Sequence, residues 1–126
     1  MVVLLGARQT DYLRFALLLQ RNGEFEGRRL LGKKTIEFMT ADHVGAAPGR
    51  PPGLGFGLGF EVRKSTGEAS FPGSTGEYGW AGNAGTLFWI DPKEDLTAIY
   101  MVQVGDGERM MLRNQFRTLV QASIMR

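Results

Sequence analysis

One glycine-rich segment constrains the fold of this chain more than any other. Residues 77–86 contain Gly79, Gly82 and Gly85 and lead directly into the apolar run of residues 87–90. Glycine permits backbone conformations and close approaches that other residues exclude. We therefore predict a bend at residues 77–86, followed by a strand. The backbone N–H groups of the bend should face a space that only small residues keep clear.

Length and composition bound the class of protein. A chain of 126 residues with 43% hydrophobic and 22% charged residues is typical of one folded domain. The net charge of +2 disfavours nucleic acid as a partner. The absence of cysteine excludes disulfides, thiolate metal sites and a cysteine nucleophile. No apolar stretch is long enough to cross a membrane, so we expect no membrane association.

The amino terminus carries no recognisable targeting signal. Residues 1–7 are apolar, but no basic residue precedes them, and Arg8, Asp11 and Arg14 follow soon after. This pattern predicts no signal peptide, and the cytoplasm is the default location.

The first part of the chain reads as a helical hairpin over residues 11–40. A helix is predicted at residues 11–21, with Thr10 as its cap and Asn22-Gly23 as its stop. A second helix is predicted at residues 33–40. The residues expected to face inward are Tyr12, Phe15, Ala16, Leu19, Ile36 and Met39, and the additional Leu13, Leu17 and Leu18 predict that the first helix packs on both sides.

The rest of the chain alternates between glycine-rich connections and strands. Residues 41–55 form a Pro/Gly loop, and the alternation over residues 56–63 predicts one strand, with close approach of another backbone at its glycines. Residues 86–91 and 96–104 predict a hairpin of two central strands covered on both faces. A final helix is predicted at residues 108–124. Its expected inward residues are Leu112, Phe116, Leu119 and Val120.

These elements predict an α+β fold, with an antiparallel sheet portion of three strands and flanking helices. We expect the strands within residues 56–104 and a single partial domain over residues 1–126.

Most residues that could take part in catalysis or ligand binding have a simpler structural interpretation. The glycines of residues 53–59 do not match the spacing of a dinucleotide-binding loop. His43 is the only histidine and is more simply structural or solvent-facing than catalytic, and with no cysteine a zinc site is disfavoured. We predict no metal and no cofactor. Trp89 lies in an apolar run and should be core, whereas Trp80 could be either structural or the wall of a pocket.

Several segments resemble the carboxy-terminal part of serine hydrolases related to class C β-lactamases and similar esterases. The resemblance is carried mainly by Trp80-Ala81-Gly82 and by Trp89-Ile90-Asp91-Pro92, and it extends over the chain from about Thr10. It implies a β-lactamase/transpeptidase-like fold and acyl transfer to a serine. By this resemblance Trp80, Ala81 and Gly82 form the third motif, and the backbone N–H of Asn83 is a donor of the oxyanion hole.

The other motifs of that family are absent from these 126 residues. No serine is followed three positions later by lysine, and no tyrosine is followed two positions later by asparagine. The leading hypothesis is therefore a truncated or split serine hydrolase that is inactive alone. A separately encoded amino-terminal segment would complete the site for a small ester or amide. The alternative hypothesis is a non-enzymatic interaction module or a homodimerising remnant of the fold, with apolar faces that serve a partner.

Overall fold

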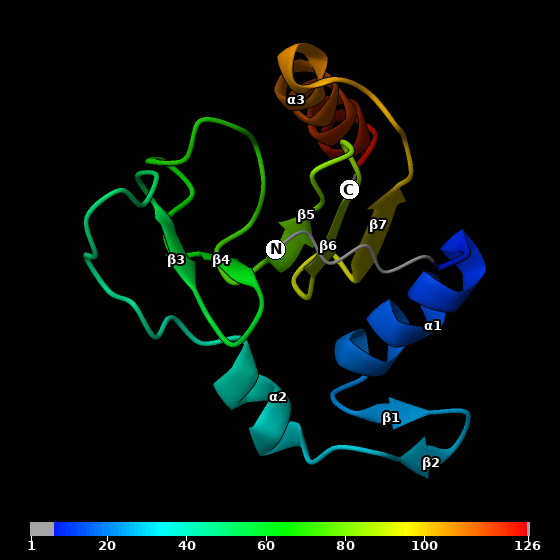
Figure 1. Cartoon of the computed structure of the whole chain (residues 1–126). Coiled ribbons are helices and arrows are strands. Elements are labelled where there is room, and N and C mark those ends of the chain that lie inside the picture. The colour runs from blue at the N-terminus through cyan, green and yellow to red at the C-terminus, as the bar shows by residue number, and fades with distance from the viewer. Residues whose placement is uncertain (1–6, 126) are drawn as a thin grey trace.

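The computed structural model describes residues 7–125 (Figure 1). In chain order its elements are α1 (Gln9–Gln20), β1 (Glu24–Phe25), β2 (Arg28–Arg29), α2 (Lys33–Met39), β3 (Leu54–Phe56), β4 (Glu61–Arg63), β5 (Tyr78–Ala81), β6 (Leu87–Asp91), β7 (Leu96–Tyr100) and α3 (Asp106–Ala122). The α+β class is as expected. The predicted absence of a signal peptide concerns residues that lie, up to Gly6, outside the described range.

The main sheet is larger than the sequence suggested. It has five antiparallel strands in the order β3-β4-β5-β6-β7, so each strand pairs with its neighbour in sequence. The prediction of three strands was wrong. Residues 78–81 of the expected bend are a regular strand, β5, and the turn is confined to the residues that follow it.

The predicted strand at residues 56–63 is in fact a hairpin. Strands β3 and β4 pair with Leu54 opposite Arg63 and Phe56 opposite Glu61, and residues 57–60 form the loop between them. Gly59 adopts a φ of +93°, which a side chain would oppose. The predicted close approach holds at Gly57, where an added Cβ would lie 2.2 Å from the Met39 carbonyl oxygen. It does not hold at Gly59, which has open space around it.

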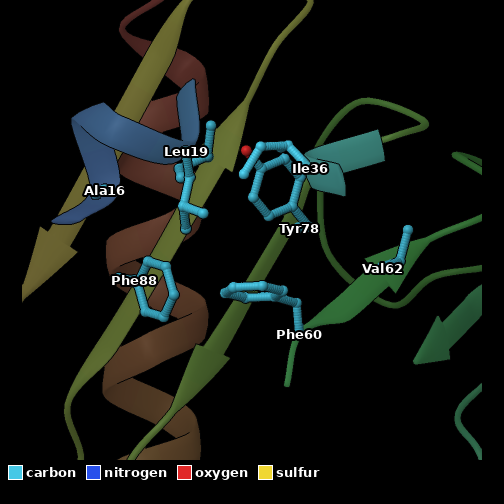
Figure 2. Packing of buried hydrophobic residues seen from close by; sticks show 8 residues of the cluster. Ala16, Leu19, Ile36, Phe60, Val62, Tyr78 and Phe88 are labelled. Atoms are coloured by element: carbon cyan, nitrogen blue, oxygen red, sulfur yellow. The ribbon is translucent and has the colours of Figure 1, made fainter. Parts of the chain in front are cut away.

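The helices cover both faces of the sheet. One cluster packs α1 and α2 against one face and includes Ala16, Leu19, Ile36, Phe60 and Phe88 (Figure 2). A second cluster on the opposite face joins Leu87, Trp89 and Ala98 to Phe116 and Val120 of α3. Figure 1 shows α1 and α3 on opposite sides of β5, β6 and β7.

The hairpin of β6 and β7 was predicted correctly, but its two strands differ in burial. All residues of β6 are buried, as expected for a central strand. Strand β7 is the last in the sheet and is only partly buried, so the prediction that it is central was wrong. Asp91 shapes the connection because its Oδ1 accepts hydrogen bonds from the Lys93 and Glu94 N–H groups at 3.0 and 3.3 Å.

The amino-terminal helices differ from the prediction in three details. The residue before α1 is Arg8 and Thr10 lies inside the helix, so Thr10 is not its cap. The stop is as expected, with Asn22 and Gly23 at positive φ. Leu13 and Phe15 are exposed, so within this chain α1 does not pack on both sides. The segment between α1 and α2 also contains the small hairpin of β1 and β2.

The face that α3 turns to the sheet was predicted only in part. Phe116 and Val120 do pack on the second cluster, but Leu119 is 70% exposed. The buried residues of α3 are instead Arg113 and Arg117. No helix in residues 7–125 is long and apolar enough to span a membrane.

Candidate functional site

Strand β5 has a free edge where the third motif begins. It pairs with β4 only through Tyr78 and Gly79, opposite Val62 and Glu61. Trp80 and Ala81 pair with Phe88 and Leu87 of β6 on the other side. Strand β4 diverges because the residues before Glu61 belong to the loop of the β3–β4 hairpin. The separation leaves one edge of β5 without a neighbouring strand at Trp80 and Ala81.

A compact turn at residues 82–86 follows this edge. The Gly82 N–H donates to the Thr86 carbonyl at 2.9 Å, and the Gly85 N–H donates to the Gly82 carbonyl at 3.1 Å. Gly85 has a φ of +105°, and a Cβ there would lie 2.7 Å from the Val104 side chain. The turn therefore depends on a small residue with left-handed backbone geometry at Gly85.

Arg113 of α3 holds this turn from the second face of the sheet. Its guanidinium donates to the carbonyls of Gly85 at 3.1 Å and Thr86 at 3.2 Å, and also to the Gly82 carbonyl. Burial lowers the pKa of Arg113, and the charge of nearby Arg109 lowers it further. The planar guanidinium suits this role because several N–H groups diverge from one rigid centre.

Asn83 lies at the exposed tip of the turn. Arg109 Nη1 donates to its backbone carbonyl at 2.9 Å and to its Oδ1 at 2.7 Å, and is paired with Asp106 at 2.7 Å. Within residues 7–125, the Asn83 N–H donates to no protein acceptor. The arrangement therefore fixes the carbonyl side of Asn83 and leaves its N–H available as a donor.

The predicted site residues lie in sequence along the edge and turn. Trp80 is 46% exposed, and its ring packs edge-on against Phe56 with centroids 4.8 Å apart. Beside it is a pocket of about 190 Å³. The residues that line this pocket are Ala7, Tyr12, Trp80, Ala81, Gly82, Thr86, Leu87, Phe88, Ile99 and Met101. Trp80, Ala81 and Gly82 thus share one pocket wall, whereas Asn83 is not among its lining residues.

The second face of β4 and β5 carries a buried ionic cluster. Glu77 Oε1 accepts a hydrogen bond from Arg63 Nε at 2.9 Å and another from Arg117 Nη1 at 2.9 Å. The ring of Phe71 contacts both guanidinium groups, at 4.6 Å from Arg63 and 4.4 Å from Arg117. Burial lowers the pKa of Arg117, and the charge of Glu77 opposes that shift.

Sequence reasoning missed that Arg113 binds the carbonyls of the turn and that Arg117 pairs with Glu77. It assigned the inward face of the last helix from its apolar residues alone. The available signal was the spacing of Arg109, Arg113 and Arg117, which stand four positions apart and so share one stripe of a helix.

Two other residues that could act as a catalytic base, His43 and Tyr78, are not placed to do so. His43 is exposed, and its Nε2 donates to the Phe38 carbonyl at 2.6 Å, away from the third motif. Burial raises the pKa of Tyr78 to about 12, so its phenol remains protonated at neutral pH and is not a ready base. Among residues 7–125 there is no group of three side chains suited to hold a metal ion.

Comparisons with known proteins identify the family. A family model described as Beta-lactamase matches residues 7–122. Protein Rv1367c of Mycobacterium tuberculosis (strain ATCC 25618 / H37Rv) is 31% identical over an alignment of 104 residues, and the match covers 74% of this chain and 26% of that protein.

Solved structures show the same fold. EstCE1, described as a hydrolase with promiscuous acyltransferase activity, is 25% identical with a TM-score of 0.68. The match covers 85% of this chain and 28% of EstCE1. Simvastatin synthase (LovD) from Aspergillus terreus is 19% identical with a TM-score of 0.67, over 91% of this chain and 33% of LovD. The chain therefore spans only about a quarter to a third of these relatives, and it belongs to the beta-lactamase family.

Proposed function

We propose that this chain supplies the oxyanion side of a serine acyl-transfer site for a small ester or amide. The proposal rests on two features of residues 7–125, the edge of β5 that has no neighbouring strand at Trp80 and the Asn83 N–H that has no protein acceptor. Arg113 holds the turn that contains Asn83. A backbone donor stabilises the tetrahedral intermediate only if it is fixed and unobstructed. Glycine at position 82 lets the turn close, because an added Cβ would lie 2.2 Å from Thr86 Oγ1.

The nucleophile and its base have to come from residues outside these 126. No Ser-x-x-Lys or Tyr-x-Asn is present in the sequence. One oxyanion donor lowers a barrier by only about 2.7–4 kcal/mol, which cannot replace a nucleophile. We therefore expect the 126 residues alone to be inactive toward a chromogenic ester and a chromogenic cephalosporin. An amino-terminal segment, on the same or a separate polypeptide, would complete the site.

A chimera with EstCE1 tests the role of the Asn83 backbone. Residues 7–122 of this chain would replace the matched part of EstCE1, and hydrolysis of 4-nitrophenyl butyrate would be measured. We expect Asn83→Pro, which removes the N–H, to lower kcat by about 10²–10³. Asn83→Ala keeps the N–H and is the matched control, with a kcat close to that of the unaltered chimera.

Two results would count against this proposal. Equal losses in Asn83→Pro and Asn83→Ala would show that the side chain matters and the backbone donor does not. Turnover by the isolated 126 residues that persists in Trp80→Ala would place the chemistry elsewhere in the chain.

The alternative function is an interaction module, and one feature favours it. A groove of about 450 Å³ runs along β7, between Leu13 of α1 and Phe116 and Val120 of α3. Strand β7 is the last strand of the sheet, and its residues 96–100 carry no charge that would discourage strand addition. The amino-terminal segment of such a hydrolase, or a second copy of this chain, could bind there by the same surface. Self-association of the 126-residue chain that Leu13→Lys disrupts would favour the second copy as the occupant.

A further inference from the structure

A second pocket, of about 240 Å³, lies on the α3 face of the sheet. It is formed where β4 and β5 meet α3, and its charged lining residues are Arg63, Arg113, Arg117, Glu61 and Glu77. We propose that this pocket binds a small organic carboxylate with an apolar body. The proposal goes beyond acyl transfer, because it needs no nucleophile and concerns a second pocket, which shares only Trp80, Ala81 and Leu87 with the pocket at the third motif.

The balance of charge around this pocket is positive. Glu61 is already paired with Arg50 at 3.0 Å, and that arginine is not a lining residue. Glu77 alone faces both Arg63 and Arg117, and both donate to the same carboxylate oxygen. Among the described residues, Arg113 has only carbonyl and thioether acceptors and no acidic partner. An anion in this pocket would therefore compensate positive charge that the protein leaves unbalanced.

One guanidinium atom at the pocket also lacks a partner. Arg63 is 2% exposed, and its Nη1 is buried without a hydrogen-bond partner among residues 7–125. Buried donors of charged groups are costly when unpaired. Glu77 Oε2 is buried without a partner among residues 7–125 as well. Because both atoms are closed to solvent, a ligand carboxylate would have to bind the more accessible Arg117, whose side chain is 10% exposed.

The remaining walls select for an apolar body of limited size. Leu54, Phe71, Ala81, Leu87 and Met110 line the pocket beside the charged groups. Its volume is below the roughly 300–1,000 Å³ typical of pockets for drug-sized ligands. A monocarboxylate with one aromatic ring or a short alkyl chain matches this combination of size, polarity and charge.

The experiment compares benzoate with two probes that each lack one feature. Acetate has the charge without the apolar body, and benzamide has the ring without the charge. Binding to the 126-residue chain would be followed by NMR titration of backbone amides. We expect benzoate to bind at least about tenfold more tightly than either probe and to shift the amides of Phe71 and Asn114, which line only this pocket. Equal binding of benzoate and benzamide would overturn the carboxylate assignment.

Paired substitutions on α3 locate the site. Asn114 lines the pocket and the exposed Gln115 does not, so Asn114→Asp and Gln115→Glu add the same charge at adjacent positions. Asn114→Asp should weaken benzoate by about five- to tenfold through repulsion, while Gln115→Glu has little effect. In the same way, Met110→Trp should block the pocket and Met111→Trp should not.

Three results would contradict the proposed binding of a carboxylate in this pocket. Equal weakening by Asn114→Asp and Gln115→Glu would indicate attraction to the overall charge of the helix. Unchanged affinity in Met110→Trp would place benzoate elsewhere. The absence of benzoate binding would overturn the proposal. None of these outcomes bears on the Asn83 test, so the two proposals fail independently.

Discussion

Single side chains far apart in sequence determine the shape of the candidate site. Arg113 connects α3 to three carbonyls of the turn at residues 82–86, and Arg109 fixes the carbonyl of Asn83. Sequence reasoning located Trp80, Ala81, Gly82 and Asn83 by resemblance, and their oxyanion role stays a prediction. It could not locate Arg113, because a pattern of apolar residues does not reveal which carbonyls a buried guanidinium will bind.

Replacing Arg113 by methionine tests its hold on the turn. Arg113→Met keeps an unbranched side chain but removes the guanidinium donors from the carbonyls of Gly82, Gly85 and Thr86. The carbonyls of Gly82 and Thr86 each keep one backbone N–H donor. We expect the free energy of unfolding to fall by about 2–4 kcal/mol in urea denaturation, with faster hydrogen exchange at residues 82–86. Arg109→Met is the control and should cost less than about 1 kcal/mol, since the Arg109–Asp106 pair is at the surface. Unchanged exchange in Arg113→Met would show that the turn is rigid without α3.

Asp42 should make stability depend on acidic pH. Its Oδ1 accepts hydrogen bonds from the N–H groups of Phe56 and Val44, both at 3.1 Å, and Lys64 lies 3.1 Å from Oδ2. The hydrogen bond from Phe56 is the main cause that lowers the pKa of Asp42 to about 2. A lowered pKa in the folded state means that the stabilisation is present above about pH 4 and is lost as the pH falls through 2.

The measurement is thermal unfolding of the wild type and Asp42→Asn between pH 2 and pH 6. The wild type should be more stable at pH 6, and the difference should shrink steadily toward pH 2. Asp106→Asn, at an exposed carboxylate, is the control for loss of one negative charge. A constant difference between wild type and Asp42→Asn across this range would contradict the assignment.

At the scale of elements, the sequence correctly predicted those helices and strands that a local pattern of apolar and turn residues defines. The β6–β7 hairpin and α2 appear where expected, because apolar runs and turn residues define them. The β3–β4 hairpin was missed because residues 56, 58, 60 and 62 are alternately apolar, while the turn between the strands lies inside that same alternation. The burial of Arg117 was missed because Phe71 and Trp89, which cover its guanidinium, come from distant segments.

The substitution Gly57→Ala tests how closely the end of α2 packs against the β3–β4 hairpin. An added Cβ would lie 2.2 Å from the Met39 carbonyl oxygen and 2.8 Å from the Ala41 carbonyl oxygen. The Leu58 N–H also donates to the Met39 carbonyl at 2.8 Å. Gly57→Ala should therefore lower the free energy of unfolding by about 1–3 kcal/mol, because the backbone has to move.

Gly107→Ala is the matched control for Gly57→Ala. Gly107 lies in the first turn of α3 with open space around its Cα. The same substitution there should be neutral or raise the stability by up to about 1 kcal/mol, since alanine favours a helix. Equal effects at both positions, measured by urea denaturation, would mean that the contact at Gly57 relaxes without cost.

At the scale of the whole molecule, the unusual feature is how much apolar surface remains exposed. Leu13 and Phe15 on α1 and Met111 and Leu119 on α3 are all exposed, and β7 has a free edge. The relatives contain about three times as many residues. The sequence could indicate that α1 has more apolar residues than one buried face needs. Only the order of strands in the sheet shows that this apolar surface lies next to β7, the last strand of the sheet.

We expect the 126-residue chain to associate with itself through the groove along β7. Leu13 is 38% exposed and lines this groove, so Leu13→Lys should shift the chain toward monomer and lower its binding of an apolar dye. Leu30→Lys is the control, because Leu30 is 62% exposed but lies outside the groove. The measurement is size-exclusion chromatography with light scattering. A monomeric wild type with low dye binding would contradict a docking role for this surface.

The bonds from Arg113 to the turn also bear on the order in which the protein is made. The carbonyls that Arg113 binds belong to residues 27–31 positions earlier in the chain. A ribosome therefore releases Trp80, Gly82 and Asn83 well before it releases the arginine that fixes them. During synthesis the turn at residues 82–86 leaves the ribosome before Arg113 does, so it can form these hydrogen bonds only after that part of α3 has also emerged. In this chain the candidate site is completed by an element that is translated after it.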